Sequence, residues 1–283
     1  MIVVTAATGQ LGRLVVEDLL TRVPADTIVA AVRAPAKAAD LAERGVQVRE
    51  ADYDRPETLT AALDGADKVL LISGSEVGRR IPQHQAVVDA AMKAGVSLLA
   101  YTSAPRADTT PLAVGPEHKA TEEAIKASGL TYSILRNGWY NENYVQTAQQ
   151  AAATGTLLGS ARDGRVASAS RADFAAAAAT VLTTPGHDNT VYELAGDTSW
   201  TMTDLAADLT AITGKPITYQ DLPADTYTKA LVDGGLPEPV AEMFASIDTA
   251  IADGWLDTTT NDLSRLIGRP TTPIRDTFAT SLS

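Results

Sequence analysis

The sequence predicts an α/β fold: a doubly wound parallel sheet with helices on both faces, plus a smaller C-terminal α/β lobe. Short apolar, β-branched runs alternate with amphipathic helical patterns through the first half of the 283 residues. This alternation is typical of parallel strands covered on both faces. The rhythm changes after about residue 138, where short strands and broken helical segments follow. We therefore expect a main domain over 1–138 and a smaller region over 139–283, with the chain partly interleaved between them.

Six runs in the first half have the composition of buried strands. They are MIVVTA (1–6), TIVAAVR (27–33), VQVREAD (46–52), KVLLISG (68–74), SLLAYTS (97–103) and TYSILRN (131–137). Between the first two, Leu11, Leu14, Val15 and Leu19 follow the i, i+3, i+4, i+8 spacing of one helix face. Six such strands with intervening helices describe a doubly wound sheet.

Two further helices have recognisable starts. In DYDRPETLTAAL, Asp54 is a candidate cap and Pro56 falls in the first turn, as is usual at a helix start. In GPEHKATEEAIKASG, Pro116 has the same role and Gly129 is a plausible stop. Both helices would cover the predicted sheet.

The second half supplies the smaller region. VASASRADFAAAAATVLTTPG (166–186) predicts a helix that packs closely through alanines, and TVYELAG (190–196) a short strand. SWTMTDLAADLTAITG (199–214) begins with a Ser/Thr-rich cap and ends on Gly214, and PITYQDL (216–222) resembles another strand. The tail from Pro223 consists of helical patches. We expect this region to close over the carboxyl edge of the sheet.

Composition excludes several classes of function. A net charge of −12 and a pI near 4.7 argue against nucleic-acid binding, which requires many cations to neutralise phosphates. The chain has no cysteine, which rules out disulfides, thiolate metal sites and cysteine nucleophiles. No cluster of His, Asp and Glu suggests a metal. No export signal is visible and no run reaches the roughly 18 apolar residues of a membrane span, so we expect a cytoplasmic protein.

The N-terminal stretch VTAATGQLG resembles a glycine-rich phosphate loop that leads into a helix. A Gly-x-x-Gly-x-x-Gly pattern would need three glycines, and the chain offers Ala6, Gly9 and Gly12. Gly9 would let the backbone approach a pyrophosphate, and Gly12 would let the helix lie close to the sheet. The helix start, with Thr8, Gln10 and Leu11, would present N–H groups to the phosphates. We expect dinucleotide binding, with Ala6 at negative φ, where a methyl side chain is tolerated.

The second strand indicates which nucleotide. An NAD-selective site usually has an acidic residue at this point, but the chain has Arg33, with Lys37 one turn later. A guanidinium would pair with a 2′-phosphate, so NADP(H) is favoured over NAD(H). Asp52 and Tyr53, after the third strand, would meet the adenine. The fourth strand ends in three residues that would pass the adenosine ribose: Leu71, Ile72 and Ser73.

These motifs resemble the NmrA-like branch of atypical short-chain dehydrogenases/reductases, above all its NADPH-dependent quinone oxidoreductases and the similar triphenylmethane-dye reductases. The resemblance spans the chain through TAATGQLG, VRAPAKA, ADYD, LLISGSEVG, AYTSAP, EHKATEEAI, LRNGWYNENY, ASASRADFAAAAA, YELAGDTSWT and LIGRPTTP. It implies a Rossmann domain, a small C-terminal lobe and a substrate cleft between them. It also implies that Arg171 enters the cleft and that five consecutive residues lie near the nicotinamide: Asn137, Gly138, Trp139, Tyr140 and Asn141.

The proton donor is less clearly marked. Ordinary short-chain dehydrogenases use a Tyr-x-x-x-Lys pair, but the corresponding helix here has Val114/His118 or Gly115/Lys119, depending on register. His118 is a candidate acid because histidine titrates near neutrality; the alternative is a structural histidine. Tyr140 and Asn143 are candidate hydrogen-bond donors to a quinone oxygen, although Tyr140 could equally be a cleft wall.

Three functions remain open on this reading. The leading one is an NADPH-dependent oxidoreductase that transfers hydride to quinones or similar flat, conjugated electrophiles. A second is a redox sensor that binds NADP(H) and partner proteins without turnover. A third is a reductase of dyes, nitro compounds or imines. A homo-oligomer is compatible with all three.

Overall fold

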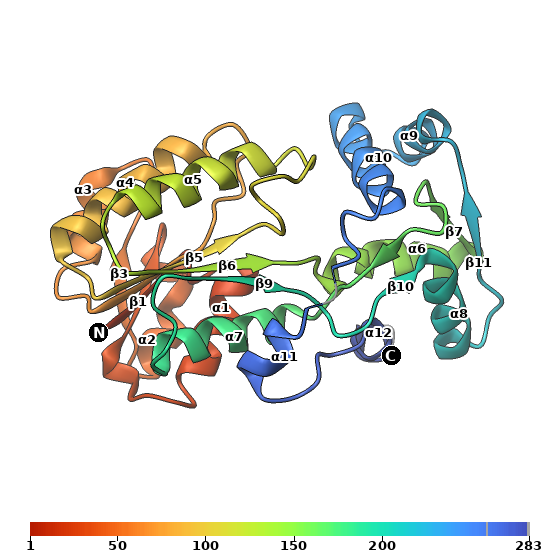
Figure 1. The fold of residues 1–283 in the computed structure, drawn as a ribbon. Coiled ribbons are helices and arrows are strands. Elements are labelled where there is room, and N and C mark those ends of the chain that lie inside the picture. Colours follow the sequence, from red (N-terminus) through yellow and green to blue (C-terminus); the bar gives the residue numbers. More distant parts are fainter. Residues whose placement is uncertain (259, 282–283) are drawn as a thin grey trace.

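The computed structural model describes residues 1–258 and 260–281, and its centre is a seven-stranded parallel sheet (Figure 1). The strand order is β3-β2-β1-β4-β5-β6-β9. The strands are β1 (Ile2–Thr5), β2 (Ile28–Val32), β3 (Gln47–Glu50), β4 (Lys68–Leu71), β5 (Leu98–Ser103), β6 (Tyr132–Asn137) and β9 (Thr190–Leu194). All six strands expected in the first half are present. The predicted doubly wound α/β fold is confirmed.

The seventh strand comes from the second half of the chain. Strand β9 pairs in parallel with β6, from Ser133 opposite Thr190 to Asn137 opposite Leu194. It corresponds to the short strand predicted from TVYELAG, but it extends the main sheet and is no part of the smaller lobe. The chain therefore leaves the sheet after β6 and later returns to it.

Helices cover both faces of the sheet (Figure 1). One face carries α3 (Pro56–Ala62), α4 (Arg80–Ala94) and α5 (Gly115–Ala127). The other carries α1 (Gln10–Leu19), α2 (Ala39–Glu43), α7 (Arg171–Thr183) and α11 (Asp262–Ile267), with short 3₁₀ turns at Ala25–Thr27 and Pro35–Ala38. Each face buries its own apolar core.

The alanine-rich helix α7 packs directly on α1. Ala175, Ala177 and Ala179 are buried there with Val15 and Leu19 of α1. Alanine side chains are short, so two helix backbones can approach closely when alanine lies at their contact. The predicted close packing of this helix is confirmed, and its partner is a helix about 160 residues earlier in the chain.

The smaller region lies at one end of the sheet (Figure 1). It contains α6 (Val145–Thr154), β7 (Thr156–Gly159), β8 (Arg165–Val166), β10 (Trp200–Thr201), α8 (Met202–Thr213), β11 (Thr218–Asp221), α9 (Ala224–Asp233), α10 (Glu238–Ala252) and α12 (Ile274–Ser281), after a 3₁₀ turn at Asn141–Tyr144. Two strand pairs, β10-β8 and β11-β7, and a separate apolar core hold it together. The division at residue 138 stays a prediction, with α7, β9 and α11 returning to the main sheet.

The structure confirms one expected helix cap and contradicts another. Thr201 caps α8 through a capping box with Asp204, and the helix ends at Gly214 as expected. Asp54, in contrast, is not the cap of α3: Arg55 occupies that position, with Pro56 as the first helical residue. The Asp54 carboxylate instead accepts hydrogen bonds from Arg79 and Gln83.

The turn between β1 and α1 corrects one expectation. Ala6 has φ = +48°, so the prediction of a negative φ was wrong. The Ala6 carbonyl oxygen accepts a hydrogen bond from the Gly9 N–H at 2.9 Å. A Cβ on Gly12 would lie only 2.4 Å from the same oxygen, so the expected close packing at Gly12 is present. This tight contact between helix and turn sets the backbone conformation at Ala6.

We expect substitutions at positions 6 and 12 to have opposite effects on stability. Holding an alanine at positive φ costs about 1–2 kcal/mol of stability. Replacing it with glycine removes this cost, but the greater conformational entropy of glycine in the unfolded chain lowers stability by about 0.4–1 kcal/mol. Ala6→Gly should therefore raise the free energy of unfolding by about 0.5–1 kcal/mol. Gly12→Ala should lower it by about 1–3 kcal/mol through overpacking. Urea denaturation measures both, and a destabilised Ala6→Gly protein would show that the turn is not strained.

Candidate functional site

A cavity of about 800 Å³ opens at the carboxyl ends of β1, β2 and β4. The strand order reverses direction between β1 and β4, and doubly wound sheets bind ligands at this switch point. Fourteen residues predicted to contact the nucleotide line it: Ala6, Thr8, Gly9, Gln10, Leu11, Gly12, Arg33, Lys37, Asp52, Tyr53, Ile72, Ser73, Tyr140 and Arg171. The structure thus brings together segments that the sequence separates by up to 165 residues.

One end of the cavity is the start of α1. Gly9 is the N-cap, no side chain caps the helix, and its first turn holds no acidic residue. The backbone N–H groups of the first turn have no partner within a helix, and the dipole places partial positive charge there. A Cβ on Gly9 would lie 3.1 Å from the Ala6 oxygen, so glycine at this position lets the helix start lie close to the turn. These features suit a pyrophosphate.

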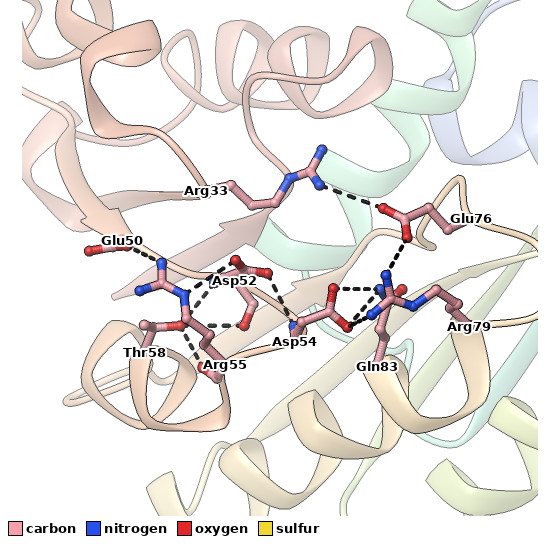
Figure 2. A network of polar contacts seen from close by, with 9 residues as sticks. All are labelled: Arg33, Glu50, Asp52, Asp54, Arg55, Thr58, Glu76, Arg79 and Gln83. Carbon is pink, nitrogen blue, oxygen red and sulfur yellow. Dashed lines mark hydrogen bonds and ion pairs between the residues drawn. The ribbon is translucent and has the colours of Figure 1, made fainter.

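The part of the cavity that follows β2 and β3 carries cations and carboxylates (Figure 2). The Arg33 side chain is 72% exposed and follows β2 directly, and Lys37 lies in the next turn. Arg33 is paired with Glu76 at 3.6 Å, and Asp52 with Arg55 at 3.3 Å. An exposed guanidinium at this position can pair with a phosphate.

Tyr53 forms part of the cavity wall. Its hydroxyl lies 2.5 Å from the Thr5 hydroxyl and donates to the Ile72 carbonyl at 2.8 Å. Burial raises the pKa of Tyr53, so the phenol stays neutral at physiological pH. The ring is therefore a fixed, uncharged surface next to the cavity.

The second half of the chain contributes Tyr140 and Arg171. The Arg171 guanidinium lies 4.9 Å from the centre of the Tyr140 ring and donates to Asn143 Oδ1 at 3.0 Å. The Tyr140 hydroxyl accepts from Asn137 Nδ2 at 3.2 Å, which leaves its own proton available for donation. Burial raises the pKa of Tyr140, so the hydroxyl keeps that proton at neutral pH.

Several residues predicted for the site do not line this cavity. Leu71 is fully buried within β4, and Asn137 is buried at the end of β6. Asn141 is buried and donates to the Thr272 carbonyl and the Thr277 hydroxyl. Three more predicted site residues lie outside the cavity. The Gly138 N–H donates to the Leu194 carbonyl, and Trp139 and Asn143 line a separate cavity of about 30 Å³ in the smaller region.

His118 also lies away from the cavity. It is 5% exposed, and its Nδ1 lies 2.7 Å from the hydroxyl of Tyr101, which is itself fully buried. Burial lowers the pKa of His118 to about 4, so the imidazole is neutral at pH 7. Of the two roles considered for His118, this placement favours the structural histidine over the acid, because a buried, neutral ring that does not line the cavity is poorly placed to donate a proton there.

The sequence reasoning missed eight residues that line the cavity: Ala51, Asp54, Gly74, Ser75, Glu76, Arg80, Gln83 and Thr102. Most belong to the segment after β4. The SGSEVG stretch there was a usable signal, since glycine-rich loops at the carboxyl ends of parallel strands often border ligand sites.

Within residues 1–258 and 260–281, no three His, Cys, Asp or Glu side chains form a group that could hold a metal ion. In the same residues no helix has the length and apolar character needed to span a bilayer.

A profile of an NAD(P)H-binding family matches residues 6–185. A relative from Aspergillus flavus, described as an NmrA-like family oxidoreductase, is 31% identical over 96% of this chain and 92% of its own. The chain belongs to this NmrA-like NAD(P)H-binding family. The expected family is confirmed.

Other members of the family are more similar. Quinone oxidoreductase 2 of Escherichia coli is 51% identical over 99% of this chain and 98% of its own. The crystal structure of an E. coli NADPH-dependent quinone oxidoreductase complexed with NADPH has a TM-score of 0.97, at 50% identity and full coverage of both chains. Citrobacter triphenylmethane reductase complexed with NADP(H) has a TM-score of 0.96, at 40% identity over 99% of this chain and all of that one.

The stability of the protein should depend on pH because two of its histidines, His84 and His118, are buried. Burial lowers the pKa of His118 to about 4 and that of His84 to about 3, both from 6.5. The unfolded chain therefore binds more protons below pH 6.5, and the stability that the neutral rings contribute above that pH is lost as the pH falls toward 4.

Urea denaturation of the wild type and of His118→Asn between pH 8 and pH 4 measures this effect. The free energy of unfolding of the wild type should fall relative to that of the variant below about pH 6.5. Asp248, whose pKa burial raises to about 6, acts in the opposite direction but cancels in this difference. Parallel curves for the two proteins would contradict the prediction.

Proposed function

We propose that this chain is an NADPH-dependent oxidoreductase that transfers hydride to quinones. The observation that carries the proposal is the cavity at the switch point, lined both by the glycine-containing start of α1 and by Arg33. The 51% identity to the E. coli quinone oxidoreductase over nearly the whole of both chains supports the same activity.

The residues around the cavity fit NADP(H). The first turn of α1 would bind the pyrophosphate through its free N–H groups, and the glycines at positions 9 and 12 let α1 lie close to the turn after β1. Arg33 and Lys37 would bind the 2′-phosphate, and Asp52 and Tyr53 would border the adenine. When bound, NADPH supplies the hydride.

The acceptor requires a proton in addition to a hydride. Tyr140 is the side chain that fits this need, because it lines the cavity, its hydroxyl is protonated and Asn137 donates to its oxygen. Arg171, over the Tyr140 ring, would stabilise negative charge that develops on a quinone oxygen. Asn143 accepts from Arg171 and so would act by positioning that guanidinium. Holding the acceptor against the cofactor would supply much of the rate.

A second class of acceptor is favoured by one comparison. The chain is 40% identical over almost its full length to a triphenylmethane reductase, so cationic dyes are candidate acceptors as well. A sensor without turnover is less well supported, because Tyr140 and Arg171, both polar residues, line the cavity.

Arg33 should determine the choice of nucleotide. The wild type should bind NADPH more tightly than NADH, and Arg33→Ala should weaken NADPH binding about tenfold, or about 1.4 kcal/mol. This loss lies near the lower end of the range for hydrogen bonds to charged groups, because Arg33 is exposed. Isothermal titration calorimetry measures the dissociation constants. Arg265→Ala, an exposed arginine outside the cavity, is the matched control. Equal affinities of the wild type for NADPH and NADH would contradict the assignment.

The acceptor and the proton donor can be tested together by following NADPH oxidation with quinones, triphenylmethane dyes and simple carbonyls. Quinones should be reduced most efficiently. His118→Ala should lower kcat less than tenfold, because His118 lies outside the cavity, whereas Tyr140→Phe should lower kcat more, because it removes the proposed proton donor. A general acid contributes about 10²–10⁴-fold, so a loss of that size in His118→Ala with unchanged binding would restore His118 as the acid. Turnover of none of the acceptors would favour the sensor.

A further inference from the structure

The segment between β4 and α4 is anchored at both ends by buried side chains. At its start, the Gly74 N–H donates to His84 Nε2 at 3.0 Å, and the Gly74 carbonyl accepts from Arg80 Nε at 2.6 Å. At its end, the Glu117 carboxylate accepts from the Gly78 N–H at 3.0 Å. His84, Arg80 and Glu117 are all buried. The segment 74–79, which we call the β4–α4 loop, therefore has a fixed path along the cavity.

The middle of this loop places a carboxylate opposite Arg33 (Figure 2). Glu76 Oε1 lies 3.6 Å from Arg33 Nη1, and Glu76 Oε2 accepts from Arg79 Nη1 at 3.1 Å. Arg33 follows β2 and Glu76 follows β4, and β1 separates these two strands in the sheet. The ion pair therefore spans the cavity between two strands that are not neighbours.

The other two carboxylates at this end of the cavity have different partners. Asp52 pairs with Arg55, and Asp54 accepts hydrogen bonds from Arg79 and Gln83 (Figure 2). Among the described residues that line the cavity, Glu76 is the carboxylate that pairs with Arg33. It thus occupies the guanidinium that a 2′-phosphate needs.

We propose that Glu76 is a specificity-determining residue that competes with the 2′-phosphate of NADP(H) for Arg33. The inference rests on the proposed function, since it takes the cavity to be the nucleotide site. A phosphate that binds Arg33 must displace the carboxylate, whereas NAD(H) has no such phosphate and leaves the pair intact. Glu76 thereby reduces the preference of the site for NADP(H) over NAD(H).

The expected effect is small because the pair is exposed to solvent. The side chains of Arg33 and Glu76 are 72% and 42% exposed, and exposed ion pairs contribute at most about fivefold to an equilibrium. A pair of this strength is readily exchanged for a doubly charged phosphate. An alternative role, in which Glu76 orients Arg33 for the phosphate, predicts a change of the opposite sign.

The test is calorimetric binding of NADP⁺ and NAD⁺, which needs no turnover, to the wild type and to Glu76→Gln. We expect Glu76→Gln to bind NADP⁺ about two- to fivefold more tightly, with a smaller change for NAD⁺. In an Arg33→Ala background the same substitution should have less effect on NADP⁺, and added salt should reduce the effect in the parent background. Glu123→Gln, which removes one exposed charge from α5 outside the cavity, controls for net charge.

Three results would overturn the proposal: weaker or unchanged NADP⁺ binding by Glu76→Gln, an equal gain for NAD⁺, or an equal gain in the Arg33→Ala background. The denaturation midpoint of each variant confirms that it is folded. Failure of the wild type to bind either nucleotide would overturn the proposed function itself. A wild type that binds NADP⁺ normally and a Glu76→Gln variant that matches it would overturn this inference alone.

Discussion

The contact between helix α1 and the turn after β1 is the constraint on which the nucleotide cavity depends. A Cβ at Gly12 would lie 2.4 Å from the Ala6 oxygen, so the helix meets the turn backbone against backbone. The same oxygen binds the Gly9 N–H, which fixes where the helix begins. Because β1 is central in the sheet and α1 packs on α7, this contact also fixes the helix start relative to β2 and β4. A wider turn would move the N–H groups away from the cavity.

Much of the fold was predictable because its signals are local. Apolar runs marked each strand, and the spacing of Leu11, Val15 and Leu19 marked the buried face of α1. The positive φ of Ala6 was not predictable, because packing against α1 imposes it. The cap of α3 was mispredicted since the Asp54 carboxylate is engaged by Arg79 and Gln83. Neither the packing of the turn against α1 nor the hydrogen bonds of Asp54 can be inferred from the spacing of residues in the sequence.

The site was predictable where residues follow strands directly, and less so elsewhere. Arg33 and Tyr53 lie close behind β2 and β3, and the carboxyl ends of parallel strands meet at one edge. Glu76 lies farther along a loop whose path is set by His84, Arg80 and Glu117, buried residues of α4 and α5. His118 had the residue type of an acid, but its contact with Tyr101 places it in the core. The sequence identified candidate residues by their side-chain chemistry, and the structure shows which of them line the cavity and which are buried in the core.

The return of α7 and β9 to the main sheet has a consequence for protein synthesis. Helix α7 covers the apolar face of α1, and β9 pairs with the edge of β6, yet both emerge from the ribosome after the first strands of the smaller lobe. Until then, a nascent chain exposes Val15 and Leu19 together with the unpaired backbone of β6. Exposed apolar surface and open strand edges favour aggregation. The growing polypeptide therefore keeps both the apolar face of α1 and the free edge of β6 uncovered between the synthesis of β6 and that of α7 and β9.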